Sequence, residues 1–185
     1  FQIENYITEL IIPEESKLNE ISIAEAIKLG ALAQKHAIDI PEFQSALSVG
    51  IYYPLGSEVH TDMIAKFAWE QGKKVSLPRT EGNVIRFYEY NGDTEFVKGR
   101  FSVMEPVPIA PPVTLDLVII PGVVFDSRGC RIGYGKGFYD RFLAQGPTPF
   151  SVGLAYSFQV VEKLPRGRFD RNLNALATDE DIIYF

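Results

Sequence analysis

The first regular feature of the chain is a stretch in which apolar side chains recur at steps of three and four residues, the spacing of one face of an α-helix. It runs from about Ile21 to Ala37 and predicts an amphipathic helix there. Ser16 or Ser22 is expected to cap its start, because a serine hydroxyl can accept a hydrogen bond from a free amide of the first turn. Pro41 ends the pattern, because proline is poorly tolerated inside a helix.

Two further helices are predicted by the same criteria. The stretch from Thr61 to Gln71 is amphipathic, with Thr61 at its N-cap and Gly72 as the residue that ends it. A third helix is expected from Gly137 to Leu143, directly after a glycine-rich turn.

Shorter apolar runs between these helices predict β-strands. The run from Leu115 to Ile120 is apolar almost throughout, which is typical of a strand buried on both faces. The segment from Val84 to Tyr90 alternates between apolar and polar residues. Further strands are predicted at residues 46–53, 74–77, 151–156, 175–177 and 182–184. Because strands that alternate with helices need crossover connections, the expected fold is a three-layer α/β domain with a mostly parallel sheet.

Composition places the chain among soluble globular proteins. Apolar residues make up 46% of its 185 residues and charged residues 23%, close to the average for such proteins. The longest apolar runs are far shorter than the ~20 residues that span a bilayer, and no signal peptide is visible, so we expect a cytoplasmic protein without a membrane partner. The single cysteine, Cys130, excludes an internal disulfide and a cysteine-based zinc site.

Charge is unevenly distributed along the chain. The formal net charge of −6 argues against a nucleic-acid partner. Residues 1–27 hold six Glu and a single cation, Lys17, whereas residues 128–171 hold eight Lys or Arg against three acidic residues. A basic segment alone is usually a solvated face, but this one overlaps a glycine-rich turn. The overlap favours a site for a small anionic ligand.

The glycine-rich turn is the most informative segment. Gly133, Gly135 and Gly137 alternate with Tyr134 and Lys136, and glycines in such positions let backbone N–H groups turn inward around an anion. A helix start follows, and its free amides also favour negative charge. The segment is neither a P-loop nor a dinucleotide-binding turn, because position 137 is not Ser or Thr and position 138 is not Gly. It predicts a phosphate site, with a plain glycine-rich turn as the alternative.

Residues 129–143, GCRIGYGKGFYDRFL, resemble the signature of the 5-formyltetrahydrofolate cyclo-ligase family, also called 5,10-methenyltetrahydrofolate synthetases. Other segments match in order and spacing: PEF (41–43), YYPLGSEVHT (52–61), LPR (77–79), MEP (104–106), PGVVFD (121–126) and AYSFQ with LP (155–165). They extend over about three quarters of the chain. One such motif is weak evidence, but seven in sequence order are specific.

The resemblance implies a Rossmann-like α/β domain and a reaction that consumes ATP. In that reaction Mg²⁺ and ATP drive ring closure of 5-formyltetrahydrofolate to 5,10-methenyltetrahydrofolate, with release of ADP and phosphate. A formamide oxygen is a poor leaving group, so its phosphorylation activates the formyl carbon towards N10. Enzymes catalyse phosphoryl transfer mostly by positioning and by neutralising charge. The expected partners are therefore folate and ATP, and the chain is expected to act as a monomer.

The resemblance also implies roles for individual residues. Arg131 and Lys136 would be catalytic. The ATP site would comprise Arg131, Ile132, Gly133, Tyr134, Gly135, Lys136, Gly137, Phe138 and Tyr139. The folate site would comprise Tyr53, Glu58, Tyr134, Gly135, Lys136, Gly137 and Phe138. Asp140 and Asp170 would support Mg²⁺.

Without the resemblance, several of these residues have simpler interpretations. Asp140 would be an acid in the first turn of a helix, where the helix dipole favours it. Asp170 would be a loop carboxylate paired with Arg168 or Arg171. Glu58 would be a solvated carboxylate.

The N-terminal part departs from the family pattern. The family usually opens with a basic helix that carries a Lys and an Arg for the ATP triphosphate, whereas residues 1–40 form a divergent, acidic and helical segment in the expected domain of residues 1–185. Either the basic pair lies upstream of Phe1 or this chain lacks it. The main alternative is therefore a weak or inactive homologue that binds nucleotide or folate. A second alternative is a different enzyme on a similar scaffold, such as a relative of sugar-phosphate isomerases or acyl-CoA transferases.

Overall fold

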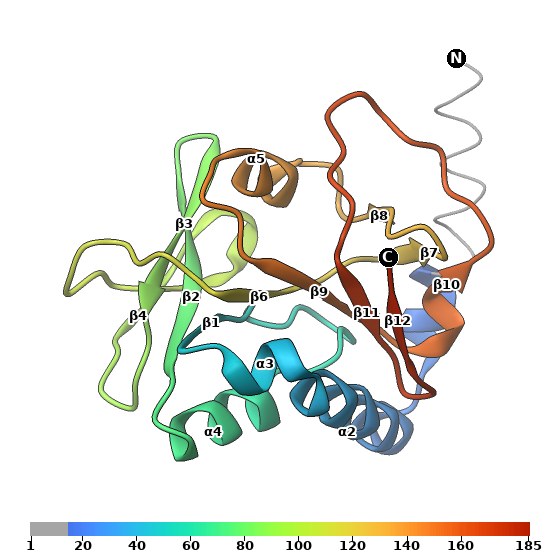
Figure 1. Cartoon of the computed structure of the whole chain (residues 1–185), viewed down its shortest axis with the longest axis horizontal. Helices are drawn as coiled ribbons and strands as arrows, with labels where there is room; N and C mark the ends of the chain where they lie inside the picture. Colours follow the sequence, from blue (N-terminus) through green and yellow to red (C-terminus); the bar gives the residue numbers. More distant parts are fainter. Residues whose placement is uncertain (1–14) are drawn as a thin grey trace.

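A seven-stranded sheet runs through the centre of the computed structural model, which describes residues 15–185 apart from the side chain of Phe101 (Figure 1). The order across the sheet is β12 (Ile182–Tyr184), β11 (Ala175–Ala177), β9 (Phe150–Leu154), β6 (Leu117–Ile120), β1 (Ser48–Gly50), β2 (Lys74–Glu81) and β3 (Val84–Glu89). The five inner strands pair in parallel, and β12 and β3 pair antiparallel at the two edges. The predicted mostly parallel sheet is confirmed.

Helices cover both faces of this sheet (Figure 1). One face carries α2 (Ile23–Asp39), α3 (Pro41–Ser45) and α4 (Asp62–Glu70), and the other carries α5 (Phe138–Ala144). Pro41 therefore ends the α2 pattern, as expected, and also occupies the first position of α3, where its missing N–H costs nothing.

Strand β6 explains why its sequence is apolar at every position. Leu117 and Ile119 belong to the core cluster beneath α2 and α4, whereas Val118 and Ile120 belong to the cluster beneath α5. All four side chains are fully buried. A central strand with helices on both sides must present apolar residues to both faces, so the three-layer arrangement and the apolar run have the same cause.

Helix ends are only partly as predicted. The Ser22 hydroxyl accepts a hydrogen bond from the Glu25 amide at the start of α2, which confirms the Ser22 alternative. Thr61 occupies the N-cap position of α4 but makes no capping bond, because its hydroxyl donates to the Tyr52 carbonyl at 2.9 Å. The Gln34 side chain from α2 accepts from the first amides of α4 instead, with Oε1 2.9 Å from the amide N of Met63.

Several short elements, each two or three residues long, were not among the predicted ones. They are the β4–β5 hairpin (Phe96–Lys98 and Met104–Pro106) with the 3-10 turn η1 (Arg100–Ser102), a small sheet in the order β10 (Val160–Val161), β7 (Val124–Asp126) and β8 (Arg131–Ile132), and the 3-10 turn η2 (Ser157–Gln159).

The N-terminal prediction is only partly covered by the structure. Residues 15–20 are helical and α2 follows them, while residues 1–14 lie outside the described residues. The extent of the domain over residues 1–185 therefore stays a prediction. Within residues 15–185, none of the helices combines the length and the apolar character that crossing a membrane requires.

The parallel strands bring distant segments to one edge of the sheet. The chain leaves β1, β6 and β9 at their carboxyl ends, and the segments that follow are residues 51–61, residues 121–137 and η2. In open parallel sheets, ligands bind at this edge. Residues from the YYPLGSEVHT, PGVVFD and glycine-rich motifs therefore converge without being neighbours in the sequence.

Candidate active site

The glycine loop, residues 133–137, connects β8 to α5. Gly135 and Gly137 have φ angles of +76° and +63°, in the left-handed region that favours glycine. Gly137 is also the N-cap of α5, and Gly135, Lys136 and Tyr134 are exposed to solvent. The predicted turn and helix start are therefore both present, and the tip of the loop is open to a ligand.

Arg141 fixes the conformation of this loop. Its Nη2 donates to the Lys136 carbonyl at 2.7 Å, its Nε donates to the Asn83 carbonyl at 2.6 Å, and its guanidinium lies 5.0 Å from the centre of the Phe138 ring. A side chain at Gly137 would approach Arg141 to 3.0 Å. One guanidinium thus ties the glycine loop to the turn between β2 and β3.

Arg131 lies at the base of the loop, in β8. Its side chain is 6% exposed, and Nε and Nη2 have no hydrogen-bond partner among the described residues. Asp140 is the nearest carboxylate, with Oδ2 3.5 Å from Nη2, and the Tyr139 ring centre lies 5.5 Å from the guanidinium. Burial lowers the pKa of Arg131, although Asp140, Tyr139 and Asp170 act in the opposite direction.

The loop between β10 and β11 brings Asp170 to the same place. Asp170 is close enough to act on the Arg131 charge, and its Oδ2 accepts a hydrogen bond from the Gly167 amide at 2.7 Å. The next residue, Arg171, donates its amide to Asp140 Oδ1 at 3.0 Å. The expectation that Asp170 pairs with Arg168 or Arg171 is therefore not what the side chain does, and Asp140 is more than a first-turn acid.

Glu58 lies in the segment that follows β1 and comes near Tyr134 of the glycine loop. It is 6% exposed, which excludes a solvated carboxylate, and its Oε2 accepts from the Leu55 amide at 2.8 Å. Burial raises the pKa of Glu58 to about 7, although the Leu55 amide opposes this rise. In turn, Glu58 helps to raise the pKa values of Tyr139 and Tyr134, so its carboxyl group lies near both tyrosines.

Tyr53 is less closely joined to these residues. Its side chain is 42% exposed, and its ring centre lies 6.2 Å from that of Phe96 in β4. The tyrosine before it, Tyr52, is the one buried near Glu58, and its hydroxyl donates to the Val59 carbonyl at 2.6 Å.

Comparison with known proteins agrees with this geometry. Residues 15–179 match the sequence profile of the 5-formyltetrahydrofolate cyclo-ligase family. The chain belongs to this family. The enzyme class expected from the motifs, a folate ligase of one-carbon metabolism, is confirmed.

Individual relatives cover most of the chain. The 5-formyltetrahydrofolate cyclo-ligase of Haemophilus influenzae is 34% identical over 74% of this chain and 78% of its own length. The Escherichia coli K12 enzyme of the same name is 33% identical over 84% of this chain and 90% of its own length. The solved structure of Aquifex aeolicus 5,10-methenyltetrahydrofolate synthetase has a TM-score of 0.84 at 33% identity, with 96% of this chain and 91% of that chain covered. A Mycoplasma pneumoniae synthetase, at 22% identity and a TM-score of 0.75 over 93% of this chain and 98% of that chain, shares the fold.

The carboxylates of this cyclo-ligase fold suit a divalent metal only together with phosphate. Within residues 15–185 there is no group of three or more His, Cys, Asp or Glu side chains that could hold a metal ion. Asp140 and Asp170 both lie near Arg131 and both have acceptor capacity beyond their present hydrogen bonds. Mg²⁺ commonly uses one or two carboxylates and completes its shell with water and substrate phosphates. The residues therefore fit Mg²⁺ bound with a nucleotide.

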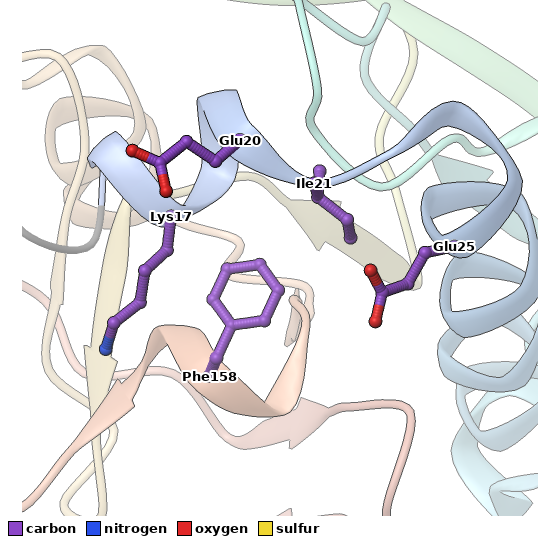
Figure 2. A pocket seen from close by; sticks show the side chains of 5 residues that line it. All are labelled: Lys17, Glu20, Ile21, Glu25 and Phe158. Carbon is purple, nitrogen blue, oxygen red and sulfur yellow. The ribbon is translucent and has the colours of Figure 1, made fainter.

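Two cavities of the described region do not include the predicted site residues. One is a hollow of about 280 Å³ between helical residues 15–20, the start of α2 and η2. Figure 2 shows the Lys17 side chain beside the Phe158 ring, with Ile21 and Glu25 towards α2. The other, about 350 Å³, lies at the amino ends of β1, β6 and β9 and is lined by Leu47, Asp116 and Phe150 among others. Neither cavity is lined by Arg131 or Glu58.

Sequence reasoning missed three contributors to the site: Arg141, Tyr52 and the Arg171 amide. The signals for Arg141 were its place in the 129–143 segment and its position four residues after Gly137, one helical turn into α5. Tyr52 opens the YYPLGSEVHT segment but was not selected as a site residue. The contact of the Arg171 amide had no signal, because it joins residues far apart in the sequence.

Proposed function

We propose that this chain catalyses the ATP-dependent ring closure of 5-formyltetrahydrofolate to 5,10-methenyltetrahydrofolate, with release of ADP and phosphate. The observation that carries the proposal is the position of two buried charged groups of opposite sign against one glycine loop. Glu58 lies near Tyr134 and Tyr139, and Arg131 lies at the base of the loop with N–H groups that have no partner among the described residues, 15–185. A carboxylate suits the N–H donors of a pterin, and a guanidinium suits phosphate.

The reaction divides between these two ends of the site. The formyl oxygen on N5 attacks the γ-phosphorus of ATP, the bond to the ADP oxygen breaks, and the formyl carbon becomes electrophilic. N10 then attacks that carbon and gives up its proton to solvent, the carbon–oxygen bond breaks, and phosphate leaves with the former formyl oxygen. Arg131 and Lys136 stabilise the negative charge on the transferred phosphoryl group. Glu58 holds the pterin so that N10 and the formyl carbon stay in reach.

The proposal extends to the remaining predicted residues. The backbone of residues 131–139 surrounds the phosphates, and Tyr53 contacts the folate from its exposed position. Asp140 and Asp170 support Mg²⁺, which supplies further positive charge to the phosphates when it is bound. Their two carboxylates and the lack of a larger acidic group among residues 15–185 support a metal that arrives with ATP.

The test is formation of the methenyltetrahydrofolate chromophore from 5-formyltetrahydrofolate. The absorbance should rise only when ATP and Mg²⁺ are both present, and one ADP should appear per folate converted. A protein whose melting temperature rises with ATP or folate but which forms no chromophore would be a binding homologue, and the proposal would be wrong. Chromophore formation without ATP would contradict the proposed role of the glycine loop.

A further inference from the structure

Arg131 is a buried cation whose neighbours, among the described residues, leave part of its hydrogen-bonding capacity unused. Nε and Nη2 are both buried without a hydrogen-bond partner among residues 15–185. The nearest counter-charge is Asp140 Oδ2 at 3.5 Å, too long for a strong charge-assisted hydrogen bond but close enough for strong ionic attraction. A buried polar group without a partner is costly, and its explanations include a catalytic role and a bound water or ion.

Asp140 is held in this position from its other oxygen. Oδ1 accepts the Arg171 amide at 3.0 Å, while Oδ2 faces Arg131. Asp140 therefore joins three segments. Its backbone lies in α5, its Oδ1 accepts a hydrogen bond from the loop between β10 and β11, and its Oδ2 faces the Arg131 charge in β8. Its side chain is 20% exposed, so it can reach solvent and a ligand at the edge of the buried guanidinium.

We propose that the Asp140 carboxylate takes the place of a nucleotide phosphate beside Arg131 when no nucleotide is bound. When Mg²⁺ binds, Asp140 releases Arg131 to the nucleotide phosphate. This inference rests on the proposed function and adds to it a coupling between metal and nucleotide. A phosphate that reaches Arg131 without Mg²⁺ must displace the Asp140 carboxylate or lie beside it, and both cost free energy. When Asp140 turns to the metal, that cost disappears. The two ligands therefore bind more tightly together than separately, and by the same factor in either order.

Asp170 offers a matched control in the same cluster. It carries the same charge and also acts on Arg131 over distance, but its carboxylate is engaged with the Gly167 amide rather than with the guanidinium. Asp170→Asn therefore removes a negative charge near the proposed phosphate site without releasing Arg131. Asp140→Asn removes a charge of the same sign and also the carboxylate that faces the Arg131 guanidinium.

The experiment is calorimetric titration of ADP into the unsubstituted protein, Asp140→Asn and Asp170→Asn, first with a metal chelator and then with excess Mg²⁺. Without metal, Asp140→Asn should bind ADP roughly tenfold more tightly than the unsubstituted protein, within the usual range of coupling between two sites. Asp170→Asn should improve binding by less than about threefold, since only a longer-range repulsion is removed. Mg²⁺ should tighten ADP binding in the unsubstituted protein much more than in Asp140→Asn.

The outcomes separate this inference from the function on which it rests. The inference would be overturned if all three proteins bound ADP equally well without metal, or if both variants gained ADP affinity equally. The proposed function would still stand in that case, provided that the unsubstituted protein binds Mg²⁺–ADP. Failure of that protein to bind Mg²⁺–ADP would overturn both. Thermal unfolding of each variant checks that the fold is retained, and Asp140→Ser provides the same comparison if Asp140→Asn does not fold.

Discussion

Two buried charged side chains of the small β10–β7–β8 sheet have opposite surroundings. Asp126, at the end of β7, accepts the amides of Arg128, Cys130 and Leu164 at 2.9 to 3.0 Å and pairs with the Arg128 guanidinium at 2.6 Å. Within residues 15–185, Arg131 in β8 has one carboxylate at 3.5 Å and two nitrogen atoms without a hydrogen-bond partner. A buried charge whose hydrogen bonds are complete joins parts of the fold, whereas one left incomplete indicates a ligand.

The two residues come from motifs that are neighbours in the sequence and both are charged, so charge alone does not separate them. Asp126 joins the PGVVFD turn to the LP segment, because the Leu164 amide donates to it and the Leu164 carbonyl accepts from Arg128 at 2.7 Å. Gln159 likewise connects η2 to the PGVVFD turn, because its Nε2 donates to the carbonyls of Gly122 and Val123 at 3.0 Å. Part of the motif set therefore holds the loops together, and another part is left for substrate.

The largest expected effect is on turnover, from replacing the incomplete cation. Arg131→Met should lower kcat by about 10²-fold or more, as removal of a charge-stabilising donor does in other active sites. It should leave the melting temperature unchanged or higher, because a buried charge without full pairing costs stability. Lys136→Met, at the exposed tip of the loop, should also lower kcat and leave stability unchanged. The measurements are steady-state kinetics and thermal unfolding. A large loss of stability in Arg131→Met would show that Arg131, like Asp126, stabilises the fold, and would contradict the difference drawn between them.

Glu58 provides the next largest effect. Glu58→Gln should weaken folate binding roughly tenfold or more, with ADP binding nearly unchanged, because a donor of the bound pterin would lose its acceptor. Calorimetric titration with each ligand measures both affinities. Equal losses for the two ligands would contradict a site divided between a folate end and a phosphate end.

The same variant has a pH signature. The pKa of Glu58 is about 7 in the folded protein and ~4.3 in an unfolded chain, so the folded state binds the proton more tightly. Its contribution to stability is present below about pH 4.3 and is lost as the pH rises through 7. At pH 8, Glu58→Gln should therefore melt at a higher temperature than the unsubstituted protein, and the difference should shrink as the pH falls and disappear only below about pH 4.3. Melting curves across this range test the sign.

Asp126 should act on stability with the opposite sign. Burial alone would raise its pKa, but the Leu164 amide and Arg128 outweigh that effect and hold the pKa of Asp126 below its usual range. Its contribution is thus present above the ordinary value of ~3.9 and is lost as the pH falls further. Asp126→Asn should cost about 1–3 kcal/mol at pH 7 while kcat at low temperature stays close to that of the unsubstituted protein. Denaturant unfolding at pH 7 and pH 3 measures the stability cost and its pH dependence, and steady-state kinetics measures kcat. A kcat loss equal to that of Arg131→Met would refute the structural role of Asp126.

The smallest expected effect comes from Arg141, which contacts the loop rather than the substrate in the proposed arrangement. Arg141→Lys can keep one of the two carbonyl contacts and loses the planar contact with Phe138. We expect the KM for ATP to rise roughly three- to tenfold, as loss of one hydrogen bond predicts, with the KM for folate little changed. Arg86→Lys is the matched control, because Arg86 forms an exposed pair with Glu81 at 3.0 Å. Equal effects of both substitutions would remove the positioning role of Arg141.

Features that depend on residues close in the sequence were predictable. The cap of α2 at Ser22 and the positive φ angles of Gly72 and Gly137 follow from local backbone chemistry. The buried strand β6 follows from an uninterrupted apolar run. The family motifs, read in order, also selected the loop residues and carboxylates that the fold then brings close to one another.

Features that depend on distant residues were decided by the tertiary structure. Gln34 replaces Thr61 as the acceptor at the start of α4 because α2 packs beside it, 29 positions away in the sequence. Asp140 meets the Arg171 amide across 31 positions. No periodicity carries such information, since each contact exists only after the strands have set the order of the loops at one edge of the sheet. The sequence by itself determined which residues can do the chemistry, and the packing decided which charges are satisfied and which remain open to a ligand, because satisfaction depends on what surrounds a group in space.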